Sequence, residues 1–181
     1  MKKLITTLAC LLLSTGLFAQ KYSAEKSNVK FFSEALLEDI TATTEKMDAI
    51  VDFENSTFFF RIKINTFQFD KDLMQEHFNE NYMESEQYPN GSFKGSFTPA
   101  IDPSKDGSYQ VEMNGELNIH GKVQKRTIPV TINIKNGQVS FESKFMVKLE
   151  DHKVKIPKVV FQNIAEEVEV TVSSMMVPLK K

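Results

Sequence analysis

The sequence is poor in several residue types, and each shortage argues against a class of protein. Its 181 residues include one cysteine, so no disulfide framework can hold the fold. Seven glycines and six prolines are too few for a low-complexity or collagen-like chain. Neither sign of charge dominates, since 22 Lys and Arg residues face 24 Asp and Glu residues. This balance argues against nucleic acid and against an anionic membrane surface as partners.

The aromatic residues are unevenly divided among the three types. There is no tryptophan and there are only four tyrosines, but the chain has 15 phenylalanines. Phenylalanine buries a large apolar ring without a polar atom that needs a hydrogen-bond partner. The excess therefore indicates an extensive apolar interior, which is either a filled core or a lined cavity.

The first 19 residues have the features of a signal peptide. Two lysines precede a run of apolar or small residues, 4–13, and Ala19 offers a small residue for cleavage. The run is too short to span about 30 Å of hydrocarbon, and no later stretch resembles a membrane span. Cys10 lies within the run, so we expect it to be removed with the signal peptide. We therefore expect an exported protein, periplasmic or secreted, with cleavage near Ala19 and a mature single domain of residues 20–181.

Most of the remaining chain alternates between apolar and polar residues, which is typical of strands with one buried face. The clearest segments are 58–64, 111–119, 128–134, 139–147 and 168–172, and shorter candidates are 29–33, 40–44, 49–53 and 92–97. Asn136-Gly137 predicts a tight hairpin between two of these segments. Many strands joined by short connections predict an all-β fold, either an antiparallel sandwich or a closed barrel.

Residues 70–83 interrupt the alternation. Their spacing predicts a short helix near residues 70–80, and Asp70 or Asp72 could cap its start. The stripe on one face of this helix consists of Leu73, Met74, His77 and Phe78. Because a helix between strands of a β-protein often covers one end of a barrel, we expect it in that position.

The sequence contains no recognisable catalytic or metal-binding motif. The three histidines have no HxH or HExxH spacing, and no cofactor fingerprint or GxSxG motif occurs. Glu76 beside His77 is the one pair that suggests acid–base chemistry, although a packing role for His77 is simpler. We expect His120 to be a turn residue and Glu84 to be a carboxylate in a solvated loop. We therefore expect a non-catalytic protein without a metal or cofactor.

Two segments of the chain resemble the YceI-like family of exported bacterial proteins. The first comprises Leu73-Met-Gln-Glu-His-Phe78, Tyr82-Met83-Glu84, Gln87-Tyr88-Pro89 and Ser92-Phe93-Lys94-Gly95. The second comprises Gly115-Glu-Leu-Asn-Ile-His120-Gly121 and then Ile128-Pro-Val130. The chain departs from the family pattern at 72–76, which lacks an Arg-Asp pair, and at 150–157, which lacks Ser-Asp-Phe-Gly. It therefore resembles a divergent member.

The resemblance implies a lipocalin-like, eight-stranded antiparallel barrel with a helix against it. It also implies an apolar cavity that holds an isoprenoid-like chain, such as a quinone or a polyprenyl phosphate, and it allows a homodimer. His77 and Lys94, which belong to the matched segments, are candidates for binding the polar head. The inward-facing candidates for the lining are Phe58, Phe60, Ile62, Phe93, Met113, Leu117, Val130, Ile132, Phe141 and Phe145.

Two other functions stay open from the sequence. A barrel filled by its own phenylalanines would act through protein–protein contacts in the cell envelope. A small enzyme of isoprenoid or lipid metabolism would use His77 and Glu76. An eight-stranded barrel encloses a space that side chains can just fill or that one small ligand can occupy. The presence of a cavity therefore separates the carrier from the filled barrel.

Overall fold

The computed structural model describes residues 21–34, 39–156 and 165–179, so the predicted signal peptide lies outside the described residues. Within them, ten strands form one antiparallel sheet. The strands are β1 (Lys21–Ser33), β2 (Ile40–Thr44), β3 (Met47–Asp52), β4 (Thr57–Lys63), β5 (Gln68–Phe69), β6 (Asn90–Thr98), β7 (Gly107–Ile119), β8 (Lys122–Lys135), β9 (Gln138–Lys148) and β10 (Glu167–Pro178).

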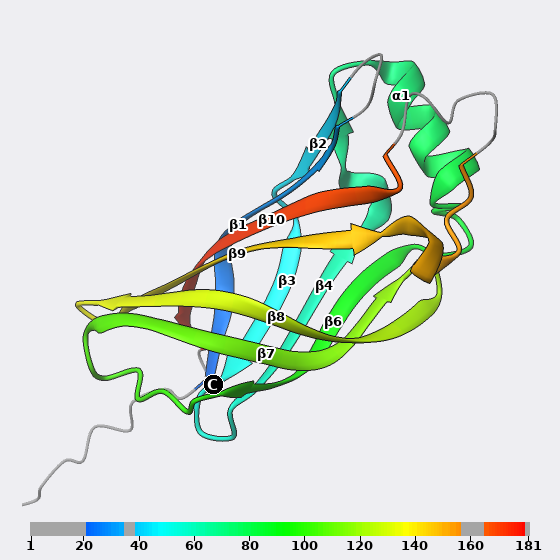
Figure 1. Ribbon diagram of the computed structural model, residues 1–181. Helices are drawn as coiled ribbons and strands as arrows, with labels where there is room; N and C mark the ends of the chain where they lie inside the picture. Colours follow the sequence, from blue (N-terminus) through cyan, green and yellow to red (C-terminus); the bar gives the residue numbers. More distant parts are fainter. Residues whose placement is uncertain (1–20, 35–38, 157–164, 180–181) are drawn as a thin grey trace, which may run out of the picture.

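The sheet closes on itself because β1 pairs with β10 (Figure 1). The closed part follows the order β1, β3, β4, β6, β7, β8, β9 and β10. β1 pairs with β3 through its first residues and with β2 through its last, and β5 then pairs with β2. The predicted eight-stranded antiparallel barrel is therefore confirmed, and β2 and β5 are additions to it.

The start of β1 differs from the pattern in the sequence, whereas the hairpin between β8 and β9 agrees with it. β1 begins at Lys21, well before the predicted segment 29–33, and its pairing with β10 shifts between Ala24 and Lys26. Such a bulge inserts one residue and reverses the inward phase, so the alternation is broken there. The Asn136-Gly137 hairpin is as predicted, because both residues have positive φ and connect β8 to β9.

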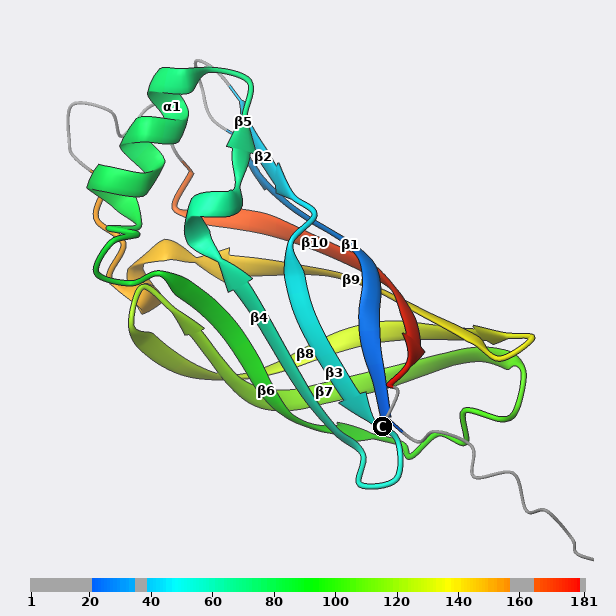
Figure 2. The ribbon, with the colours of Figure 1, turned by 180° about the vertical axis from the view of Figure 1, so that it is seen from behind.

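The predicted helix is present at one end of the barrel, beside β2 and β5 (Figure 2). It consists of α1 (Asp72–His77) and the π-helical segment η2 (Phe78–Tyr82). Its N-cap residue is Lys71 and no side chain caps its start, so the predicted capping by Asp70 or Asp72 is wrong. Asp72 instead lies in the first turn, where a carboxylate favours the helix dipole. No helix of the described residues is long and apolar enough to cross a membrane.

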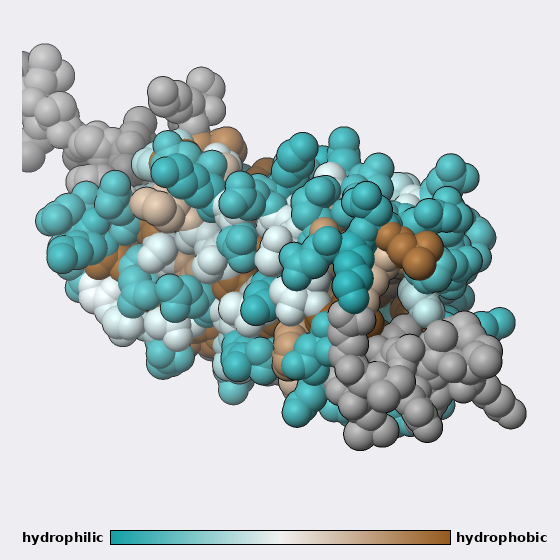
Figure 3. Space-filling view, turned by 90° about the horizontal axis from the view of Figure 1, so that it is seen from above, coloured by the Kyte–Doolittle hydropathy of each residue, from teal (hydrophilic) through white to brown (hydrophobic). Residues whose placement is uncertain are grey.

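The half of the barrel interior farther from α1 is filled by side chains. Tyr22 and Phe53 meet edge to face there, with ring centroids 5.4 Å apart, and Phe97 lies 5.8 Å from Phe53. The face of the molecule that Figure 3 shows is mostly hydrophilic, as expected for strands with one buried face. The buried side chains of this half, none more than 6% exposed, include Tyr22, Val51, Phe53, Phe58, Phe97, Val111, Ile132, Ile134, Val139 and Met176.

Candidate ligand-binding site

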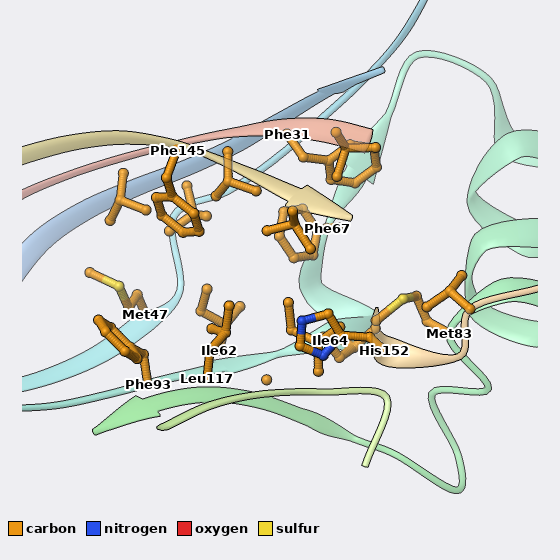
Figure 4. Close-up of a pocket in the computed structure, with 18 of the residues that line it drawn as sticks. Phe31, Met47, Ile62, Ile64, Phe67, Met83, Phe93, Leu117, Phe145 and His152 are labelled. Atoms are coloured by element: carbon orange, nitrogen blue, oxygen red, sulfur yellow. The ribbon is translucent and has the colours of Figure 1, made fainter. Parts of the chain in front are cut away.

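The half of the barrel nearest α1 is hollow and contains a cavity of about 340 Å³ (Figure 4). All eight strands of the closed barrel contribute to its wall, as do α1, η2 and the two 3₁₀ segments η1 (Ile64–Thr66) and η3 (Leu149–His152). A cavity of this size lies within the range of small-molecule sites in proteins. The phenylalanine-rich interior is therefore filled in one half and hollow in the other.

Nine of the twelve residues predicted from the sequence line this cavity. They are Phe60, Ile62, His77, Phe93, Met113, Leu117, Val130, Phe141 and Phe145. Phe58 and Ile132 also face inward, but they are at most 4% exposed in the filled half of the barrel. Each lies two residues along its strand from a residue that lines the cavity. Alternation therefore predicts correctly that these side chains face inward, but it does not predict whether they lie in the hollow or the filled half of the barrel.

Lys94, a candidate for binding the polar head, lies on the outer surface of the barrel. It follows the inward-facing Phe93 on β6, so the pleat of the strand turns it to the outer surface. Its side chain is 61% exposed, and its Nζ lies 3.4 Å from Glu116 Oε2 on β7. Lys94 is therefore not part of the candidate site.

Four phenylalanine rings join the helical segment to the barrel and form part of the cavity wall. Phe31 of β1 stacks on Phe78 of η2 at 5.5 Å between centroids and lies 5.5 Å from Phe67. Phe69 of β5 lies 5.0 Å from Phe78. None of these four rings is among the residues predicted from the sequence to line the cavity. The sequence gives little indication that Phe67 and Phe69 face inward, because a strand of only two residues, β5, is too short to show alternation.

A hydrogen-bonded group connects three segments close to the cavity. Nε2 of His120 lies 2.7 Å from Glu84 Oε2, and its Nδ1 lies 3.2 Å from the carbonyl oxygen of His152. Tyr88 packs edge to face on the His120 ring at 4.5 Å. Both ring nitrogens of His120 therefore face oxygen atoms. His120 is in a turn, as predicted, but it is also buried, and Glu84 is its partner rather than a freely solvated carboxylate.

His152 is a fully buried polar residue in the cavity wall and is not among the residues predicted from the sequence. Its side chain lies near Ile64 and Met83 in Figure 4, and Nδ1 donates a hydrogen bond to the carbonyl oxygen of Lys122 at 3.0 Å. Burial lowers the pKa of His152, although the carbonyl groups of Lys122 and Ile119 favour its protonated form. The uncharged ring is therefore the favoured form in the folded protein.

The geometry gives little support to catalysis by the pair on α1. His77 lines the cavity, but both it and Glu76 are exposed, and no described hydrogen bond joins them. Among the described residues there is also no cluster of three or more His, Cys, Asp or Glu side chains that could hold a metal ion.

Comparisons with known proteins agree with this architecture. The model of the YceI-like domain family matches residues 21–175, whereas no curated protein matches the sequence. A polyisoprenoid binding domain from Saccharophagus degradans, implicated in plant cell wall breakdown, is similar with a TM-score of 0.75 and 12% identity. The similarity covers 87% of this chain and 98% of that one.

Two further solved structures have the same fold. BcnA from Burkholderia cenocepacia is similar with a TM-score of 0.70 and 19% identity, over 83% of this chain and 96% of its own. The YCEI protein of Campylobacter jejuni has a TM-score of 0.63 and 15% identity, over 82% of this chain and 90% of its own. At these identities, the likeness to solved structures concerns the fold alone.

Proposed function

Because this chain belongs to the YceI-like family, we propose that it is an exported, non-catalytic carrier that holds an isoprenoid-like lipid in its barrel. The observation that carries the proposal is the hollow, apolar half of the barrel. The name of the Saccharophagus degradans relative, a polyisoprenoid binding domain, supports a prenyl chain as the ligand. A quinone or a polyprenyl phosphate would supply such a chain.

The chemistry of the wall favours a long apolar ligand. Its side chains are mostly Phe, Ile, Val, Leu and Met, and burial of a prenyl tail against them gains about 25 cal/mol per Å² before the costs of binding. Two serines of the wall are already engaged with backbone, since Ser143 Oγ donates to the carbonyl of Pro129 and Ser33 Oγ accepts from the amide of Ala165. The wall therefore offers few hydrogen bonds that would favour water over hydrocarbon.

The two other functions have less support. A barrel that acts only through protein contacts needs no cavity, and the hollow half argues against it. An enzyme that uses His77 and Glu76 needs a held geometry, but both side chains are exposed on a six-residue helix. Substitution of His77 tests that alternative, which gains only if a measured conversion disappears while folding and lipid binding survive.

Mass spectrometry of organic extracts tests the carrier function. Protein purified from a quinone-rich host should release an isoprenoid lipid in near-stoichiometric amount. Val170 lines the cavity between Phe31 and Phe145, so Val170→Trp should block the cavity and abolish the extracted lipid. Thr171→Trp is the matched control, because Thr171 is exposed on the same strand.

The two variants also report on the cavity directly, because the protein has no tryptophan of its own. The indole emission of the Val170→Trp protein should be blue-shifted, as expected for a ring that fills the apolar cavity. The emission of the Thr171→Trp protein should be that of a solvent-exposed indole. A lipid-free extract from correctly folded wild-type protein, together with no binding of added prenyl compounds, would overturn the proposed function.

Export and dimerisation stay predictions. N-terminal sequencing of protein from the exported fraction should give Gln20 as the first residue, in agreement with cleavage after Ala19. An uncleaved cytoplasmic product would contradict export. Light scattering of the purified protein tests the homodimer that the family resemblance allows.

A further inference from the structure

One polar atom in the cavity wall has no partner. Three buried side-chain polar atoms of the described residues lack a hydrogen bond: Asn79 Oδ1, Asn118 Oδ1 and His152 Nε2. Of these three residues, only His152 lines the cavity. Its side chain is completely buried, so bulk water does not reach the ring. A buried polar atom without a partner is costly, so it marks a place where a ligand atom would be favoured.

The hydrogen bond on the other side of the ring determines what His152 can bind. A carbonyl oxygen can only accept, so the 3.0 Å contact with Lys122 O requires a proton on Nδ1. In the uncharged ring, Nε2 then carries a lone pair and no proton. His152 therefore presents an acceptor, and the matching ligand atom must be a donor.

The ring is held in place by its neighbours. The backbone carbonyl of His152 accepts a hydrogen bond from Nδ1 of His120, and Nε2 of His120 is bound to Glu84. Ile64, Met83 and Val154 form a small buried apolar cluster at this end of the cavity. Figure 4 places His152 beside Ile64 and Met83, toward α1, whereas Met47 and Phe93 lie at the other end of the view. The acceptor is thus fixed at the end of the cavity nearest α1.

We propose that Nε2 of His152 accepts a hydrogen bond from a hydroxyl group at the polar end of the bound lipid. This inference rests on the proposed carrier function. The ligand class it selects is a prenyl alcohol or a prenylated quinol. An oxidised quinone and a fully ionised phosphate offer only acceptors, which do not match the lone pair of Nε2. His152 would act as a specificity residue, while the apolar wall supplies the affinity.

A pair of probes that differ by one hydrogen-bond donor tests the inference. Farnesol and its methyl ether have the same prenyl chain, and a quinol and its quinone with a two-unit prenyl tail form a second pair. Titration calorimetry on delipidated protein should show about three- to tenfold tighter binding of the donor in at least one pair. A preference for the donor within the first pair alone would indicate that the ligand is a prenyl alcohol. A preference within the second pair alone would indicate that it is a quinol.

Variants show whether His152 causes the preference. His152→Phe should remove the difference within each pair while the ether or quinone still binds. Thr171→Phe is the control, because Thr171 is exposed on the outer face of β10 and its substitution should leave the preference intact. Equal binding of donor and non-donor by wild-type protein would overturn this inference but not the carrier function. If none of the four probes binds, both proposals fail.

Nitrogen-15 NMR of the imidazole rings gives a test that needs no variant to fold. With only three histidines, His152 can be assigned, and its Nδ1 should carry the proton. Addition of farnesol should shift the Nε2 resonance toward that of a hydrogen-bonded acceptor, and the methyl ether should not. A proton on Nε2 in the free protein would overturn the inference.

Discussion

Asp52 shows how a single side chain can organise a turn of the barrel. It ends β3, and its Oδ1 accepts hydrogen bonds from the backbone amides of Glu54 and Asn55 at 3.1 and 3.2 Å. Its Oδ2 accepts from Asn55 Nδ2 at 2.9 Å and lies 3.2 Å from Lys21 Nζ. These donors, with the Asn55 side chain first, lower the pKa of Asp52 below its usual value.

Asp52→Ala should lower the free energy of unfolding by about 1–2 kcal/mol at pH 7, because several donors lose their acceptor. A lowered folded-state pKa means that the stabilisation is complete above the unfolded value of about 3.9 and is lost as the pH falls through the folded value. Urea denaturation should therefore show the difference between the two proteins shrinking below about pH 4. Asp48→Ala is the control, because Asp48 is 65% exposed and its pairing with Arg61 should contribute less than about 1 kcal/mol.

The burial of His152 predicts a second effect of pH on stability. Its folded-state pKa is lowered, so between the unfolded value of about 6.5 and the folded value only the unfolded chain takes up the proton. The free energy of unfolding should therefore decrease as the pH falls below about 6.5. His152→Phe should remove this component. An identical pH dependence in the wild type and the variant would contradict the prediction.

At the scale of elements, β6 and β7 approach each other closely at a pair of glycines. Gly95 on β6 is directly opposite Gly115 on β7. A Cβ atom on Gly115 would overlap the carbonyl oxygen of Lys94, and one on Gly95 would overlap that of Asn114. The backbones therefore come closer here than side chains at these positions would allow.

Gly115→Ala should destabilise the protein by about 2 kcal/mol or more, because β6 and β7 would have to move apart. Gly91→Ala is a suitable control on β6, since its added Cβ would make an ordinary contact at 3.5 Å from Ile64 Cδ1. Thermal unfolding of both variants measures the difference. Equal melting temperatures would show that the close approach of the strands is not needed.

The elements show which parts of the fold can be predicted from the sequence. Period-two alternation marks the inward face of β4 and β7–β10, because one buried face leaves a plain signature. The start of β1 is hidden by a bulge, and β5 is too short to carry a pattern. No pattern in the sequence predicts that His152 is buried. Its position depends on the short segment η3 and on the left-handed backbone of Lys153, which ends η3.

At the scale of the whole molecule, the barrel combines a filled half with a hollow half. Phe58 and Phe60 illustrate the division, because they lie on the same face of β4 and stack on each other at 5.2 Å. Phe58 belongs to the filled half, and Phe60 lines the cavity. Local sequence does not separate them, since the boundary depends on how much side-chain volume all eight strands place at that level.

Phe58→Ala should cost about 3–5 kcal/mol, the usual penalty of a new void in a packed core. Phe60→Ala should cost about half as much, because part of its ring already borders empty space, and should weaken binding of farnesol instead. Chemical denaturation and calorimetry on the same two proteins provide the comparison. A larger loss of stability in Phe60→Ala than in Phe58→Ala would contradict the division of the barrel.

In a barrel that carries a prenyl chain, the filled half would also limit the length of that chain. Its packed side chains would stop the tail, so the distance between them and His152 would set the longest tail that still lets the hydroxyl reach the ring. Affinity for a series of prenyl alcohols should rise with each added unit and then level off or fall. Calorimetry across the series would locate the break, and Phe58→Ala should move it toward longer alcohols.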